Sequence, residues 1–164
     1  MMNRRSRGTW VIVLSFVAAL ILTVLPLPSW AVSYQPVWVM LVLIYWCIAL
    51  PERVGVATGW CLGIILDVVH DAVLGQYALS MTIVAYLALY LHRRLRLLPV
   101  WQQTLSIFVL VLVGQILILW IKGITSDLTW STAYLMPPLI SAILWPAVFV
   151  ILRGLRRRYV PTYR

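Results

Sequence analysis

The chain has 164 residues, of which 63% are apolar and only 10% charged, and its formal net charge is +9. So few charged side chains cannot coat a water-soluble domain of this size, and the lipid bilayer is therefore the expected solvent. The basic excess alone would suit nucleic-acid binding, but the arginines flank apolar segments and do not line one folded face, which argues against that function.

Six apolar runs follow one another along the chain, at residues 10–25, 37–50, 54–69, 77–91, 105–121 and 136–152. They predict an all-α membrane protein, with residues 1–164 forming one domain, a six-transmembrane-helix bundle. A spanning helix needs about 20 residues, so the second and third runs are marginal unless neighbouring helices bury their ends. A re-entrant hairpin turning at Pro51-Glu52-Arg53 is the alternative. We favour six spans, because Arg53 would be costly inside hydrocarbon.

Three arginines precede the first run, which is followed by a small-x-small sequence, Ser29-Trp30-Ala31. This arrangement is also typical of a cleaved secretory signal, and cleavage would leave five spans. The apolar run slightly exceeds the usual length of a signal sequence, so we expect an uncleaved first helix.

The basic residues mark one side of the membrane. Twelve of the 13 Lys and Arg residues lie on alternate connections between the runs or at the two termini: Arg4, Arg5, Arg7, Arg53, Arg93, Arg94, Arg96, Arg153, Arg156, Arg157, Arg158 and Arg164. The other connections carry only Lys122. Because short loops rich in Lys and Arg are retained in the cytoplasm, both termini are expected to be cytoplasmic.

Aromatic residues support this orientation as interfacial anchors. They lie near the predicted outer ends (Trp30, Tyr34, Tyr77, Trp120, Trp130 and Tyr134) and near the predicted inner ends (Trp10, Tyr90, Trp101 and Tyr159). Two tryptophans fall deep within runs, Trp60 and Trp145, and are expected to pack inside the bundle.

Four other residues inside the runs have ordinary structural interpretations. Cys47 and Cys61 have the spacing of neither a metal knuckle nor a redox pair, so we expect buried, inert thiols. Gln115 and Ser141 are polar at depth and are expected to form hydrogen bonds between helices.

A four-residue period runs through the third span and beyond it, at Gly55, Gly59, Gly63, Asp67, Asp71 and Gly75. Residues four apart stay on one face of a helix over this distance, and glycine there lets another helix approach closely. The glycine ridge, defined as Gly55, Gly59 and Gly63, would contact either a partner subunit or a neighbouring span. We favour the internal contact.

Asp67 has three competing interpretations: a hydrogen-bond acceptor at a helix end, a proton or cation relay, or a metal ligand together with His70 and Asp71. The chain has only four acids, Glu52, Asp67, Asp71 and Asp127. A relay would therefore lack a second acid within the membrane, and three ligands at a span end are weak evidence for a metal. The acceptor role is favoured.

Enzymatic chemistry finds little support in the sequence. The chain lacks a G-x-S-x-G elbow, an H-E-x-x-H pair and a phosphate-binding G-x-x-x-x-G-K loop. Asp67 and Asp71 follow each other in one segment, whereas an intramembrane aspartyl dyad needs carboxylates from different helices. We expect no catalytic residues, no metal and no cofactor.

Several segments resemble the MreD family of bacterial rod shape-determining proteins, in its proteobacterial form. They are Gly63-Ile64-Ile65-Leu66-Asp67-Val68, Leu74-Gly75, Ala85-Tyr86, Leu50-Pro51-Glu52-Arg53-Val54, Trp101-Gln102-Gln103 and Leu144-Trp145-Pro146. The resemblance covers nearly the whole chain and is most specific between Gly55 and Tyr86. It departs at His70-Asp71, so no role for that pair follows from the family.

The resemblance implies a non-catalytic, multi-pass subunit of the cell-elongation complex in the bacterial inner membrane. MreC is the expected direct partner, with MreB, RodA and its transpeptidase in the same complex, and the basic patches suit anionic lipids. The alternative function is a small transporter, specifically a vitamin-binding S-component, a family whose fold MreD proteins are thought to share. S-components typically dock through an Ala-x-x-x-Ala pattern in the first helix, which Ala18 and Ala19 do not form here.

Overall fold

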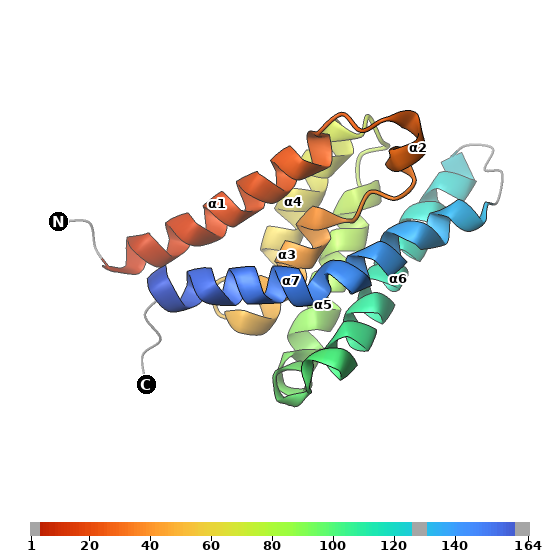
Figure 1. Ribbon diagram of the computed structural model, residues 1–164. Coiled ribbons are helices and arrows are strands. Elements are labelled where there is room, and N and C mark those ends of the chain that lie inside the picture. The colour runs from red at the N-terminus through yellow and green to blue at the C-terminus, as the bar shows by residue number, and fades with distance from the viewer. Residues whose placement is uncertain (1–3, 126–130, 160–164) are drawn as a thin grey trace.

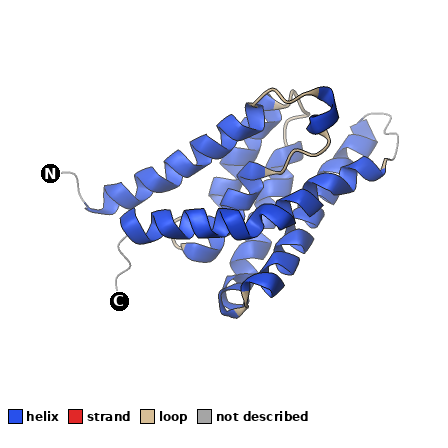
Figure 2. Ribbon diagram, viewed as in Figure 1, coloured by secondary structure: helices blue, strands red, loops and turns tan. Residues whose placement is uncertain are grey.

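The computed structural model describes residues 4–125 and 131–159, and these form helices without any strand (Figure 2). The elements are α1 (Arg4–Val24), α2 (Ser29–Val32), α3 (Trp38–Ala49), α4 (Val56–Val69), α5 (Gln76–Leu97), α6 (Val100–Thr125), the short 3₁₀ helix η1 (Thr132–Leu135) and α7 (Met136–Tyr159). The predicted all-α fold is confirmed, and each of the six apolar runs overlaps a helix. Asp127, Trp130 and Arg164 lie outside the described residues.

Two stretches of the described chain are long and apolar enough to cross a membrane on length and composition: α6, and η1 together with α7. The apolar part of α1, residues 8–24, is shorter, as are α3 with 12 residues and α4 with 14. At 1.5 Å per residue, α3 and α4 extend only about 18 and 21 Å, against about 30 Å of hydrocarbon.

The central helix is α3, which packs against α1, α5, α6 and α7 (Figure 1). All its residues from 39 to 49 are buried, and the chain places no charged side chain among them. Because α3 is buried on every side by neighbouring helices, it lies in the interior of the bundle. Hydrophobic burial around α3 therefore organises the other helices.

In contrast, α4 lies at the periphery and packs mainly against α5. One face of α4 is buried, and the opposite face, which we call the open face, is exposed: Ala57, Trp60, Cys61, Ile65, Val68 and Val69. The expected burial of Trp60 and Cys61 was wrong, because the glycines occupy the interior side of this helix. Trp145 and Cys47, by contrast, are buried as expected.

Side chains from distant parts of the chain bind the ends of two helices. The Gln35 amide donates to the carbonyl oxygens of Leu22 and Thr23 at the end of α1, at 3.3 and 2.9 Å. The Ser141 hydroxyl accepts the backbone amide of Val37, the residue before α3, at 3.0 Å. This is the interhelical hydrogen bond expected of Ser141.

At the other end of α3, the Arg96 guanidinium donates to the carbonyl oxygens of Ile48 and Ala49, at 2.7 and 2.8 Å. Arg96 lies in the last turn of α5, so this contact ties the two helix ends together. A terminal carbonyl that finds no partner within its own helix is thereby satisfied inside the protein.

The arginine-bearing parts of the chain gather at one end of the bundle. The start of α1 and the end of α7 lie side by side, where Trp10 and Tyr159 line a common cavity. In Figure 1 the first turn of α1 and the last turn of α7 both lie at this end. The ends of α3 and α5 meet through Arg96, whereas the end of α1 and the α4–α5 turn lie at the opposite end.

Candidate functional site at the α4–α5 turn and its cavity

The glycine ridge faces α5 of the same chain. A Cβ atom built on Gly63 would lie 2.3 Å from Cα of Ala78, and one on Gly59 would lie 2.8 Å from the carbonyl oxygen of Met81. Real Cβ atoms do not approach other atoms this closely, so the backbones of α4 and α5 touch at these two glycines. This is small-residue helix packing of the kind found in membrane bundles.

The two outer members of the four-residue period behave differently. A Cβ on Gly55 would lie 3.6 Å from Leu89 Cδ1, an ordinary van der Waals distance. Gly75 immediately precedes α5 and has φ +103°, a left-handed conformation that glycine adopts without steric cost. Gly75 thus serves the turn, whereas Gly55 marks the start of α4.

Asp67 binds the start of α5 although it belongs to α4. Its carboxylate accepts the backbone amides of Gly75 at 2.8 Å, Tyr77 at 2.6 Å and Ala78 at 3.4 Å. The side chain is only 1% exposed. Three amide donors and the positive end of the α5 dipole compensate the desolvation of the negative charge. The geometry corresponds to the acceptor role among the three interpretations of Asp67.

The other two members of the proposed metal set point elsewhere. Asp71 is exposed at φ 49°, and the His70 ring stacks on Tyr77 with centroids 4.7 Å apart. His70 Nδ1 lies 3.0 Å from the carbonyl oxygen of Leu66. Across the part of the chain that the structure describes, no three His, Cys, Asp or Glu side chains are close enough to hold a metal ion.

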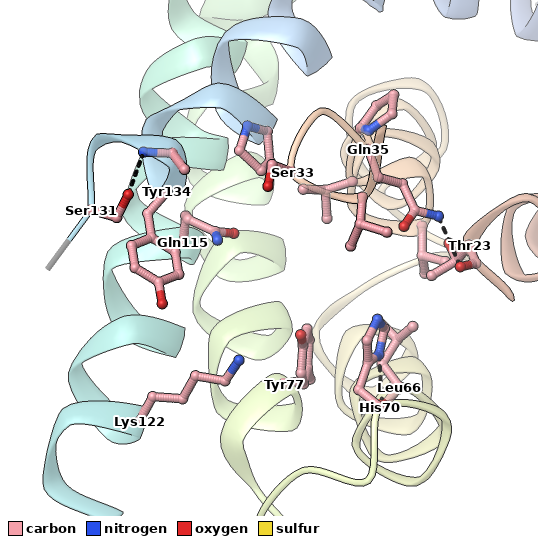
Figure 3. Close-up of a pocket in the computed structure, with 16 residues that line it drawn as sticks. Thr23, Ser33, Gln35, Leu66, His70, Tyr77, Gln115, Lys122, Ser131 and Tyr134 are labelled. Atoms are coloured by element: carbon pink, nitrogen blue, oxygen red, sulfur yellow. Dashed lines mark hydrogen bonds between the residues drawn. The ribbon is translucent and has the colours of Figure 1, made fainter. Parts of the chain in front are cut away.

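Beside this turn lies a cavity of about 500 Å³, opposite the arginine-bearing end (Figure 3). Polar side chains from six segments reach it: Thr23, Gln35, His70, Tyr77, Gln115, Lys122 and Tyr134. Its volume falls in the range of small-molecule sites, about 300 to 1,000 Å³. Gln115 lines this cavity and makes no hydrogen bond to another described residue. The prediction that Gln115 forms a hydrogen bond between helices was therefore wrong.

Sequence reasoning missed this cavity. Thr23 and Tyr134 are more than a hundred positions apart, and no local motif links the lining residues. Only the fold brings them together. The one signal in the sequence was Lys122, the single basic residue on the predicted outer side.

Residues 4–155 of this chain match the family model for the rod shape-determining protein MreD. The chain is also similar to the rod shape-determining protein MreD of Haemophilus influenzae, with 31% identity over 152 residues. That alignment covers 91% of this chain and 93% of the relative. No solved structure matches the chain significantly. The family resemblance read from the sequence is confirmed.

Replacing Asp67 with Asn should destabilise the protein. The amide keeps one acceptor oxygen but sets an NH₂ donor against the backbone amides, so we expect a loss of about 1–3 kcal/mol in unfolding free energy. Asp71→Asn is the matched control, because Asp71 is exposed and asparagine tolerates its left-handed backbone. Thermal unfolding of both purified variants in detergent measures the difference. Equal stability of the two variants would contradict the capping role.

Adding a methyl group along the glycine ridge should cost stability in the order Gly63→Ala, Gly59→Ala, Gly55→Ala. The first two place Cβ against backbone atoms of α5 and should lose about 1–3 kcal/mol, whereas Gly55 has room. The same unfolding assay applies. A Gly63→Ala variant as stable as Gly55→Ala would show that α4 and α5 are further apart than the structure places them.

Proposed function

Because this chain belongs to the MreD family of rod shape-determining proteins, we propose that it is a non-catalytic membrane subunit of the cell-elongation complex. In this role it scaffolds MreC and links MreB filaments to peptidoglycan synthesis by RodA and its transpeptidase, which maintains cell shape. The family match over residues 4–155 carries the proposal. The family is one of shape-determining structural proteins and not of enzymes.

The proposed placement is the bacterial inner membrane, with six spans and both termini in the cytoplasm. The alternation of arginine-bearing and arginine-poor connections supports this topology. The meeting of the start of α1, the end of α7 and Arg96 at one end of the bundle agrees with it. Exposed tryptophans near both ends, Trp30 and Trp101, would lie at the two interfaces.

The proposed docking surface for MreC is the open face of α4. This helix packs mainly against α5 and leaves Trp60 and Val68 53% and 70% exposed. Lipid alone would cover it poorly, since α4 reaches only about two-thirds of the hydrocarbon thickness. A membrane helix of MreC would supply the missing neighbour.

The glycine ridge itself is a poor place to test partner binding. Gly59 and Gly63 are already in contact with α5, so a leucine at either position would separate two helices of the same chain. Any loss of a partner would then follow from misfolding. A residue on the open face avoids this problem.

Trp60→Ala should reduce the recovery of MreC with the tagged protein by tenfold or more, because tryptophans at an interface commonly contribute 2 kcal/mol or more, which is roughly thirtyfold in affinity. Recovery is measured by quantitative mass spectrometry after mild detergent extraction of membranes. The matched control is Trp120→Ala, a tryptophan 66% exposed on α6. Equal recovery with the two variants would exclude the open face of α4. Absence of MreC from the unmodified protein would refute the scaffold proposal.

The second candidate function is uptake of a small molecule, as in a vitamin-binding S-component with the same predicted fold. The observation that favours it is the cavity of about 500 Å³ beside the α4–α5 turn, which is lined by several hydrogen-bonding side chains. The family assignment favours the structural role instead.

Deleting the protein separates the two functions. We expect the deletion strain to lose its rod shape and become spherical while growing without added vitamins, because a scaffold subunit supplies no nutrient. Microscopy and growth in minimal medium measure the two outcomes. Rod-shaped cells that require a vitamin would reverse the proposal in favour of transport.

A further inference from the structure

A second cavity, of about 460 Å³, lies at the arginine-bearing end of the bundle. Its wall is formed by the end of α3, the α5–α6 turn, the start of α6 and the second half of α7. Tyr45, Trp145 and Phe149 form its aromatic floor, with Tyr45 and Phe149 packed edge to face at 5.9 Å. The cavity is separate from the one beside the α4–α5 turn, with which it shares no residue.

The charges around this cavity are unbalanced. Arg96, Arg153 and Arg156 line it, and no carboxylate does. The Arg96 guanidinium is occupied by the carbonyl oxygens of α3. Arg153 lies over the Phe149 ring at 5.9 Å, and neither Arg153 nor Arg156 forms an ion pair with any acid in the described ranges. Two guanidinium groups therefore remain available to an anion.

Two further features of the wall suit a phosphate. Tyr45 is only 3% exposed, yet its hydroxyl has no hydrogen-bond partner among residues 4–125 and 131–159. Val100, also in the wall, is the first residue of α6, and its amide has no acceptor within the helix, whereas the amide of Gln103 donates to the carbonyl oxygen of Pro99 at 3.0 Å. A phenol, helix-terminal amides and arginines are all donors, and phosphate oxygens accept from each of them.

We propose that this cavity binds the phosphate group of an anionic membrane lipid, held by Arg153, Arg156 and the hydroxyl of Tyr45. The proposal rests on the topology given above, which places the cavity at the depth of the cytoplasmic headgroups. A lipid fits better than a soluble phosphate compound because Ile48, Leu98 and Phe149 supply apolar wall for the glycerol and the first acyl carbons. Bidentate donation by arginine matches the geometry of a phosphodiester.

Native mass spectrometry of the purified full chain tests the site, using micelles doped with phosphatidylglycerol. We expect one retained phosphatidylglycerol on the unmodified protein. Retention should fall by roughly thirtyfold in the double variant Arg153→Gln, Arg156→Gln, as expected for two lost charge contacts. Phosphatidylcholine, which carries no net charge, should be retained far less.

The matched control is Arg157→Gln, Arg158→Gln, which removes the same charge from exposed positions on the same helix outside the cavity wall. This control variant should retain the lipid. If it lost as much lipid as the Arg153, Arg156 variant, the attraction would come from the overall positive charge and not from this cavity, and the proposal would be overturned. Tyr45→Phe removes a single oxygen and should weaken retention a few-fold without unfolding the protein. Unchanged retention in both Tyr45→Phe and the Arg153, Arg156 variant would overturn the site.

Competition with inorganic phosphate tests whether the cavity binds a lipid headgroup or a soluble phosphate compound. Displacement of phosphatidylglycerol by millimolar phosphate would assign the cavity to a soluble anion and overturn the lipid proposal. Capture of MreC by the Arg153, Arg156 variant is measured in parallel. Loss of lipid with normal MreC recovery supports the lipid site independently of the scaffold function.

Discussion

The backbone groups at helix ends must find partners inside the protein, and this constraint governs the bundle. A helix that ends among apolar side chains leaves amides and carbonyls that those side chains cannot satisfy. At the start of α3, the amide of Val37 donates to Ser141, which is 104 positions away in the sequence. At the end of α3, the carbonyl oxygen of Ala49 accepts from Arg96, which is 47 positions away. The shortest and most buried of the long helices is thus held in place by α5 and α7.

The same constraint couples the two features of the α4–α5 hairpin. Gly63 lies one turn before Asp67 on α4, and at Gly63 the two backbones touch. Only such a close approach brings the Asp67 carboxylate within 2.6 to 3.4 Å of the amides that open α5. A larger side chain at Gly63 would move α5 outward and break these hydrogen bonds. Glycine packing and carboxylate capping are therefore one structural unit.

Sequence reasoning was most successful where one physical signal dominates. Hydrophobic runs located the helices because insertion into lipid requires them, and the scarcity of acids singled out Asp67. It failed for Trp60 and Cys61, since a residue facing lipid and a residue facing a neighbouring helix are equally apolar. The hydropathy of a span therefore cannot orient it. Only the backbone contact at Gly59 and Gly63 shows which face of α4 is internal.

Polar contacts between distant parts of the chain could not be predicted from the sequence, for a related reason. Arg96 reads as one more cytoplasmic arginine, yet its guanidinium binds the end of α3. Arg93 and Arg94 are exposed, as Arg96 is, but of these three arginines only Arg96 forms this contact. Position in the charge pattern thus predicts a side of the membrane but not the partner, which depends on how helix ends meet in three dimensions.

A shape-determining structural protein without chemistry of its own must act through its shape, and the helix-end contacts suit that task. A docking surface on α4 is useful only if α4 keeps a fixed position, because ordering it during binding would consume part of the interaction free energy. Asp67 fixes α4 to α5, and Arg96 fixes α5 to the central helix. These two contacts connect α4, through α5, to α3 at the arginine-bearing end, and so fix the position of the open face of α4. A partner at α4 and a lipid near Arg153 would thus bind to one preorganised framework.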